Sequence, residues 1–104
     1  MADERRKPGI ELADKPEQAA QRPRMFQVVL HNDDYTTMDF VVEVLESVFL
    51  KSPAEAFRIM MDVHRNGRGV CGVYPHEIAE TKAGLTQALA RERGFPLRAS
   101  VEEA

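Results

Sequence analysis

Several residue types are scarce in this chain, and each scarcity excludes a class of protein. Tryptophan is absent from the 104 residues, and Cys71 is the only cysteine. A single thiol excludes a disulfide scaffold within one chain, and its apolar neighbours Val70 and Val73 predict a buried strand rather than a catalytic nucleophile. No segment is long and apolar enough to cross a bilayer, and no continuous apolar segment resembles a signal peptide. We therefore expect a soluble, cytoplasmic protein with no membrane partner.

The chain also lacks a large excess of charge of either sign. The chain has 14 Lys and Arg residues against 17 Asp and Glu residues, which leaves a net charge of −3. Proteins that bind nucleic acid neutralise phosphates with a concentrated basic surface. The short basic stretch from Arg65 to Arg68 is more simply explained as solvated. The composition therefore predicts no nucleic-acid partner.

The first 24 residues differ in composition from the rest. They contain almost no large apolar side chains, carry charges of both signs and include Pro8, Pro16 and Pro23. Such a segment cannot bury enough apolar surface to offset the conformational entropy of its chain. We therefore expect residues 1–24 to form a flexible N-terminal extension and residues 25–104 to fold as one domain.

The folded part begins with a strand and a helix. Phe26–Leu30 is apolar and β-branched, and the Asn-Asp run that follows is typical of a turn. Thr36 and Asp39 have capping-box spacing and predict a helix that begins near Met38. Apolar residues then recur at helical spacing: Val41, Val44, Leu45, Val48 and Phe49.

A sharper signal predicts a second helix. Ser52–Glu55 combines an N-cap hydroxyl, a proline at the first helical position and a glutamate that can reach back to the cap. The helix should run from Pro53 to about Asn66, where Gly67 ends it. Two stripes should share its inner side: Ala56, Met60 and Val63, and beside them Phe57, Met61 and His64.

The remainder of the chain predicts a strand, a helix and a strand. Gly69–Tyr74 is the second strand, in which Gly72 indicates a bulge or a close backbone approach. Pro75 should start a longer helix that Gly94 ends. This helix has an apolar face with Ile78, Leu85 and Leu89 and a small-residue face with Ala79, Ala83, Ala88 and Ala90. A short strand over 98–101 completes an α+β fold of order β-α-α-β-α-β, with three helices and a three-stranded antiparallel sheet.

The polar run Asn32–Thr36 lies between the first strand and the first helix. Taken singly, its Asn and Asp residues most often just turn the chain, His64 on an apolar helix is more often a core histidine, and methionines are more often core filler. Together these residues indicate an apolar pocket with an acidic rim. Such a pocket suits a cationic group attached to a hydrophobic side chain.

Several separated motifs, in their order and spacing, resemble the ClpS family. They are Asn32-Asp33-Asp34-Tyr35-Thr36, Met38, Phe40-Val41, Met60, Val63-His64, Gly67, Cys71-Gly72-Val73, Glu77, Ala79-Glu80-Thr81-Lys82 and Pro96-Leu97. ClpS proteins are bacterial adaptors that deliver substrates with certain N-terminal residues to the Clp protease. The likeness spans Met25 to the C-terminus and implies the same β-α-α-β-α-β fold.

The resemblance also implies a site. The α-amino group of a substrate would be bound by Asn32, Asp33, Asp34 and His64. Its first side chain (Leu, Phe, Tyr or Trp) would enter a hydrophobic pocket formed by Thr36, Met38, Val41, Met60, Val63 and Leu97. Glu77 and Lys82, which alone would be a solvated helix face, would contact the N-terminal domain of the ClpA unfoldase. The resemblance implies a monomer with no catalytic residue, metal or cofactor.

Two other functions are alternatives to this one. His76 and Glu80 have the i, i+4 spacing of metalloprotease ligands, but Glu80 replaces the second histidine of that motif and a third ligand is lacking. A general protein-docking module of similar fold would show no preference for a free amine. Three residues also depart from the family pattern: Thr37 replaces a typical proline, His31 an aliphatic residue, and Phe95 a histidine.

Overall fold

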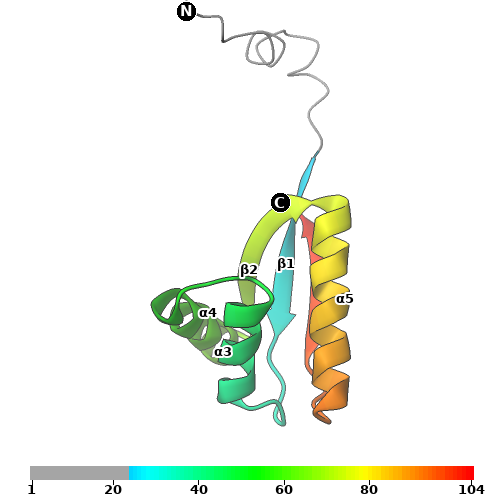
Figure 1. The fold of residues 1–104 in the computed structure, drawn as a ribbon. Coiled ribbons are helices and arrows are strands. Elements are labelled where there is room, and N and C mark those ends of the chain that lie inside the picture. Colours follow the sequence, from blue (N-terminus) through cyan, green and yellow to red (C-terminus); the bar gives the residue numbers. More distant parts are fainter. Residues whose placement is uncertain (1–23) are drawn as a thin grey trace, which may run out of the picture.

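The computed structural model describes residues 24–104, and apart from Arg24 the predicted N-terminal extension lies outside the described residues. The element order is β-α-α-β-α-β, as predicted (Figure 1). The elements are β1 (Met25–His31), α3 (Met38–Ser47), α4 (Pro53–Asn66), β2 (Arg68–Pro75), α5 (His76–Glu92) and β3 (Arg98–Glu103). No helix among residues 24–104 has the length and apolar character needed to cross a membrane.

The sheet is antiparallel, with β1 between β2 and β3. Its central position explains why Val28, Val29 and Leu30 are all fully buried. The register between β1 and β2 shifts after Val28, which pairs with Gly72, whereas the next residue pairs with Val70. Cys71 is the extra residue of this bulge, so the irregularity predicted at Gly72 lies one residue earlier.

All three helices contribute to one buried cluster on the sheet. In Figure 1, α5 runs alongside the strands, and α3 and α4 lie together beside β2. The small-residue face of α5 is the buried one, with Ala79, Ala83, Thr86 and Ala90 inside. Small side chains let the helix approach the sheet closely, whereas Ile78 and Leu85 stay 47% and 48% exposed.

The predicted ends of α4 and the predicted start of α3 near Met38 agree with the structure, but the predicted cap of α3 does not. Ser52 caps α4 through its side chain, and Gly67 ends it with φ 88°. The prediction that Thr36 caps α3 is wrong, because Thr37 accepts the hydrogen bond from the Phe40 backbone N–H at 3.1 Å. The Asp33 carboxylate accepts hydrogen bonds from both the backbone N–H and the hydroxyl of Thr36. The Thr36 hydroxyl is therefore engaged, and Thr37 serves as the cap.

Two close contacts fix α4 against the sheet. A Cβ added at Gly69 would lie 2.8 Å from Val63 Cγ2 and 3.1 Å from the Ile59 carbonyl oxygen, so the helix passes directly over this glycine. The Asn32 backbone N–H also donates to the Gly67 carbonyl oxygen at 2.9 Å. The end of β1 and the end of α4 are therefore joined beside the loop that follows β1.

Candidate functional site

A cavity of about 290 Å³ opens between the loop after β1, the start of α3 and the last two turns of α4. It is lined by Asn32, Asp33, Asp34, Thr36, Met38, Val41, Met60, Val63 and His64. These are the residues predicted for the amine site and the hydrophobic pocket, with Leu97 missing. The volume is at the small end for ligand pockets, which suits one side chain rather than a large cofactor.

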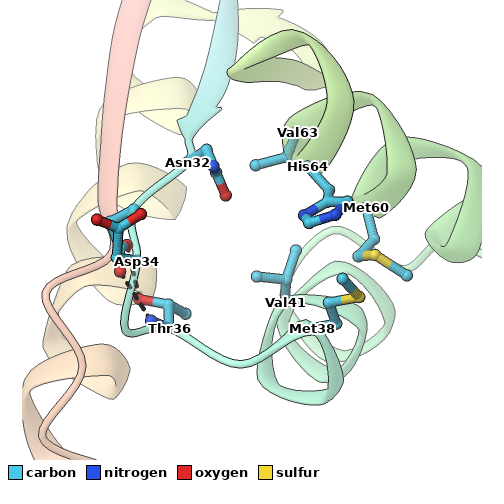
Figure 2. A pocket seen from close by; sticks show the side chains of 9 residues that line it. Asn32, Asp34, Thr36, Met38, Val41, Met60, Val63 and His64 are labelled. Carbon is cyan, nitrogen blue, oxygen red and sulfur yellow. Dashed lines mark hydrogen bonds between the residues drawn. The ribbon is translucent and has the colours of Figure 1, made fainter.

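The cavity has a polar side and an apolar side. Figure 2 shows the Asn32 and His64 side chains facing each other across the mouth, while Met38, Val41, Met60 and Val63 form the wall beside them. Asp34 lies on the loop on the side away from His64 (Figure 2). The arrangement therefore combines polar acceptors at the rim with an apolar interior.

Asn32, Asp34 and His64 keep their hydrogen-bonding groups free of other described residues. None of their side chains forms a hydrogen bond within residues 24–104, and all three are exposed. The expectation that His64 lies on the inner side of its helix is therefore wrong, and Phe57 of the same stripe is 57% exposed. Three unengaged polar groups around one opening can accept hydrogen bonds from a ligand.

Asp33 has a different role in the loop. Its carboxylate accepts hydrogen bonds from the backbone N–H groups of Tyr35 and Thr36 at 2.8 and 2.7 Å and from the Thr36 hydroxyl at 2.7 Å. Burial opposes ionisation, but these hydrogen bonds outweigh it and hold the pKa of Asp33 below its ordinary value. Asp33 therefore keeps a negative charge at the rim while it shapes the loop that carries Asp34.

Leu97, which was predicted to line the pocket, lies outside the lining of the cavity. Its side chain is 4% exposed and belongs to the buried cluster of the sheet and helices, not to the lining of the cavity. The position expected from the family resemblance is therefore a core position in this structure. Its contribution to the pocket stays a prediction.

Of the two residues expected to contact ClpA, Glu77 is exposed and Lys82 is half-buried. Glu77 lies in the first turn of α5. The Lys82 ammonium instead donates to the Val48 carbonyl oxygen at 2.8 Å, at the end of α3, and lies 5.4 Å from the centre of the Tyr74 ring. Lys82 thus ties α5 to α3, a tertiary role that its neighbours in sequence could not reveal.

The other polar candidates form no second site. His76 Nε2 lies 3.2 Å from Glu80 Oε2, and residues 24–104 contain no group of three or more His, Cys, Asp or Glu side chains that could hold a metal. Cys71 is fully buried, and burial raises the pKa of its thiol to about 12. A thiol in this environment stays protonated, so it is not a nucleophile.

The fold and the cavity together define a small binding protein. The model of the family "ATP-dependent Clp protease adaptor protein ClpS" matches residues 21–100. The chain therefore belongs to the ClpS family, whose members are adaptors of the Clp protease and not enzymes.

Named relatives agree with this assignment. The chain is 58% identical over 87 residues to the ATP-dependent Clp protease adapter protein ClpS of Nitratidesulfovibrio vulgaris strain Miyazaki F, covering 84% of this chain and 87% of the relative. It is 53% identical over 94 residues to the ClpS of Syntrophus aciditrophicus, covering 90% and 84%. A solved structure, Agrobacterium tumefaciens ClpS2 bound to L-phenylalaninamide, has a TM-score of 0.77 and 44% identity, and the match covers 80% of this chain and all of that one.

Proposed function

We propose that this adaptor binds the free α-amino group and the bulky hydrophobic first side chain (Leu, Phe, Tyr or Trp) of substrate proteins and delivers them to the ClpA unfoldase of the ClpAP protease. The observation that carries the proposal is a cavity whose apolar wall adjoins three unengaged polar groups. Phenylalaninamide, which the Agrobacterium relative binds, combines a free amine with a hydrophobic side chain.

The rim meets the chemical needs of an ammonium group. A free α-amino group has an ordinary pKa of about 7.7–8.0 and is mostly cationic at neutral pH, so enclosing it requires several acceptors. Asn32 contributes its amide oxygen, Asp34 and Asp33 contribute negative charge, and His64 contributes a ring nitrogen. An acetylated or internal nitrogen lacks the charge and the additional protons, so it should not be held.

The apolar wall selects the first side chain. Burying a Leu or Phe side chain contributes roughly 1.5–3 kcal/mol. Met38 and Met60 can adjust to side chains of different shape because thioether chains are flexible. Met38 also narrows the pocket for β-branched residues, and such steric discrimination is worth only about 1–3 kcal/mol.

Fluorescence polarisation with peptides that differ only at the first residue tests this proposal. A Leu-headed peptide should bind, whereas its acetylated and Ile-headed versions should bind weakly. Asn32→Ala, Asp34→Ala and His64→Ala should each weaken binding of the Leu-headed peptide, and His76→Ala, at an exposed histidine on α5, should leave it unchanged. Equal affinity for the acetylated peptide would favour a general docking module and overturn the proposal.

Delivery needs surfaces outside the cavity. We assign the contact with the N-terminal domain of ClpA to the part of α5 that presents Glu77, with Lys82 holding this helix against α3.

We further propose that the protein is a cytoplasmic monomer with a core domain over residues 25–104. Residues 1–24 are proposed to act as a flexible extension that the unfoldase engages. Deleting residues 1–21 should leave peptide affinity intact and slow ClpAP degradation of a Leu-headed substrate. Equal degradation rates would contradict this role.

A further inference from the structure

Four of the five methionines and the single cysteine lie among residues 24–104, and solvent reaches them to very different extents. Met25 and Met38 are 41% and 44% exposed, whereas Met60 is 5% exposed and Cys71 is fully buried. Met61 is partly buried and packs against the core. A small oxidant dissolved in water therefore reaches Met25 and Met38 most readily.

Cys71 does not compete with these methionines for an oxidant. The reactive form of cysteine is the thiolate, and burial raises the pKa of the Cys71 thiol to about 12. At neutral pH this thiol is protonated and enclosed. A methionine thioether has no proton to lose, so its reactivity depends on access and not on ionisation.

Met38 is the exposed methionine of the cavity. It is the first residue of α3 and lines both the cavity of about 290 Å³ and a second hollow of about 560 Å³ between α3 and α4. Figure 2 shows its thioether on the apolar wall together with that of Met60. Met60 lines the same two hollows but is almost completely covered. An oxidant that enters either hollow therefore reaches Met38 more easily than Met60.

Met25 has a similar accessibility but lies far from the cavity. It begins β1, whereas the loop that carries Asn32 follows the other end of this strand. The distance along the strand from Met25 to His31 is about 20 Å at roughly 3.3 Å per residue. The chain therefore offers a second exposed methionine that can be oxidised without any contact with the site.

Oxidation would make the apolar wall polar at Met38. The sulfur lone pair forms a bond to one oxygen of hydrogen peroxide, the O–O bond breaks, and a proton shift gives water and methionine sulfoxide. The sulfur loses two electrons and the peroxide gains them. The new oxygen is a hydrogen-bond acceptor that a Leu or Phe side chain cannot satisfy, so packing against it carries a desolvation cost.

We infer that Met38 is a modification site at which a peroxide reversibly weakens the binding of hydrophobic N-terminal side chains. The inference rests on the proposed binding of substrate N-termini in the cavity and adds a control over it. A thiol-dependent methionine sulfoxide reductase would reverse the change, because two thiols form a disulfide while the oxygen leaves as water. Met60, on the same wall, stays a thioether because it is covered.

Mild hydrogen peroxide treatment of the full chain, followed by peptide mapping in a mass spectrometer, tests the site. Met25 and Met38 should be oxidised at similar rates and Met60 several-fold more slowly, in line with their exposed fractions. A saturating Leu-headed peptide should slow the oxidation of Met38 and leave that of Met25 unchanged.

Fluorescence polarisation with the Leu-headed peptide measures the consequence. Oxidised protein should bind about five- to ten-fold more weakly, at the lower end of the cost of an unsatisfied polar group, because a half-exposed sulfoxide keeps part of its water. Treatment with methionine sulfoxide reductases for both sulfoxide epimers should restore the affinity. The far-ultraviolet circular dichroism spectrum and the Tm should not change, since Met38 lies outside the buried core.

Variants assign the loss of affinity to one sulfur atom. Met38→Leu, whatever its initial affinity, should bind equally before and after peroxide, whereas Met25→Leu should lose affinity as the wild type does. Met38→Gln places a polar group at the same position without any oxidant and should weaken binding by a similar factor. The matched control Met25→Gln, at an equally accessible methionine, should leave the affinity unchanged.

The outcomes separate this inference from the proposed function. If the acetylated peptide binds untreated protein as tightly as the free one, the proposed function fails and the inference loses its basis. If the free amine matters but complete oxidation of Met38 leaves the affinity unchanged, the inference alone is overturned. Resistance of Met38 to peroxide while Met25 is oxidised, loss of affinity in peroxide-treated Met38→Leu, or a loss that accompanies unfolding would each overturn it as well.

Discussion

Thr37 stands where ClpS proteins typically have proline, and its replacement tests how the loop at the cavity is held. The hydroxyl accepts a hydrogen bond from the Phe40 backbone N–H at 3.1 Å and caps α3. Replacing a threonine N-cap by alanine costs typically about 1 kcal/mol, within a range of roughly 0.5–2 kcal/mol. Thr37→Ala should therefore lower the free energy of unfolding by about 1 kcal/mol.

Thr37→Pro should behave differently, although it also removes the cap. The backbone of residue 37 has φ −75° and ψ 152°, which proline adopts without strain. Its N–H donates no hydrogen bond to a described residue, so proline sacrifices no donor there. Restricting the unfolded chain contributes about 0.4–1 kcal/mol, which offsets most of the lost cap. We expect Thr37→Pro to lie within about 0.5 kcal/mol of the wild type.

Urea unfolding and thermal unfolding, both followed by far-ultraviolet circular dichroism, measure both changes. For a folded part of this size, 1 kcal/mol corresponds to a shift of about 4–8 °C in Tm, which is easily resolved. Thr81→Ala, at an exposed position within α5, controls for loss of a hydroxyl and should be neutral or slightly stabilising because alanine favours helix. The capping argument is refuted if Thr37→Ala is as stable as the wild type, or if the proline variant is less stable than the alanine variant.

Three further predictions concern side chains outside the cavity. Burial and, to a smaller extent, the positive charges of Arg98 and Arg68 lower the pKa of His31 in the folded protein. The unfolded chain therefore binds the proton first as the pH falls below about 6.5, and the free energy of unfolding should decline between about pH 7 and pH 5. His31→Leu should flatten this decline in urea titrations. Lys82→Met keeps the apolar stem but loses the bond to the Val48 carbonyl, and a drop of about 1–2 kcal/mol in unfolding free energy is expected; an unchanged denaturation midpoint would contradict it. Cys71 should react with a thiol reagent at mildly alkaline pH only after the protein unfolds, and rapid labelling of the native protein would show that the burial argument is wrong.

Local signals predicted the helices and strands well because the residues that begin and end each element have characteristic capping and turn preferences. The helix over 53–66 was predicted to the residue, since Ser52, Pro53 and Gly67 act within one turn of its ends. The start of α3 at Met38 was predicted correctly, but its cap was assigned to the wrong threonine because two adjacent threonines offer nearly the same spacing. The choice between them depends on Asp33, whose hydrogen bonds engage Thr36.

Tertiary contacts account for what the sequence did not predict. Periodicity identified two faces of α5 without showing that the alanine face, not the one with Ile78, packs on the sheet. Helical spacing placed His64 inside, whereas the cavity leaves it at an open rim. The gathering of loop, α3 and α4 residues around one cavity was expected from the family resemblance alone, because no local rule relates segments about 30 residues apart.

The hydrogen bond from the Asn32 backbone N–H to the Gly67 carbonyl oxygen has a consequence for binding kinetics. It joins the residue that carries the amide to the end of the helix that carries the imidazole of His64, so the two sides of the mouth are held at a set separation before a ligand arrives. A preorganised mouth loses little conformational entropy when it is filled. Association should then be governed by diffusional encounter, and differences among ligands should appear mainly in how slowly they leave.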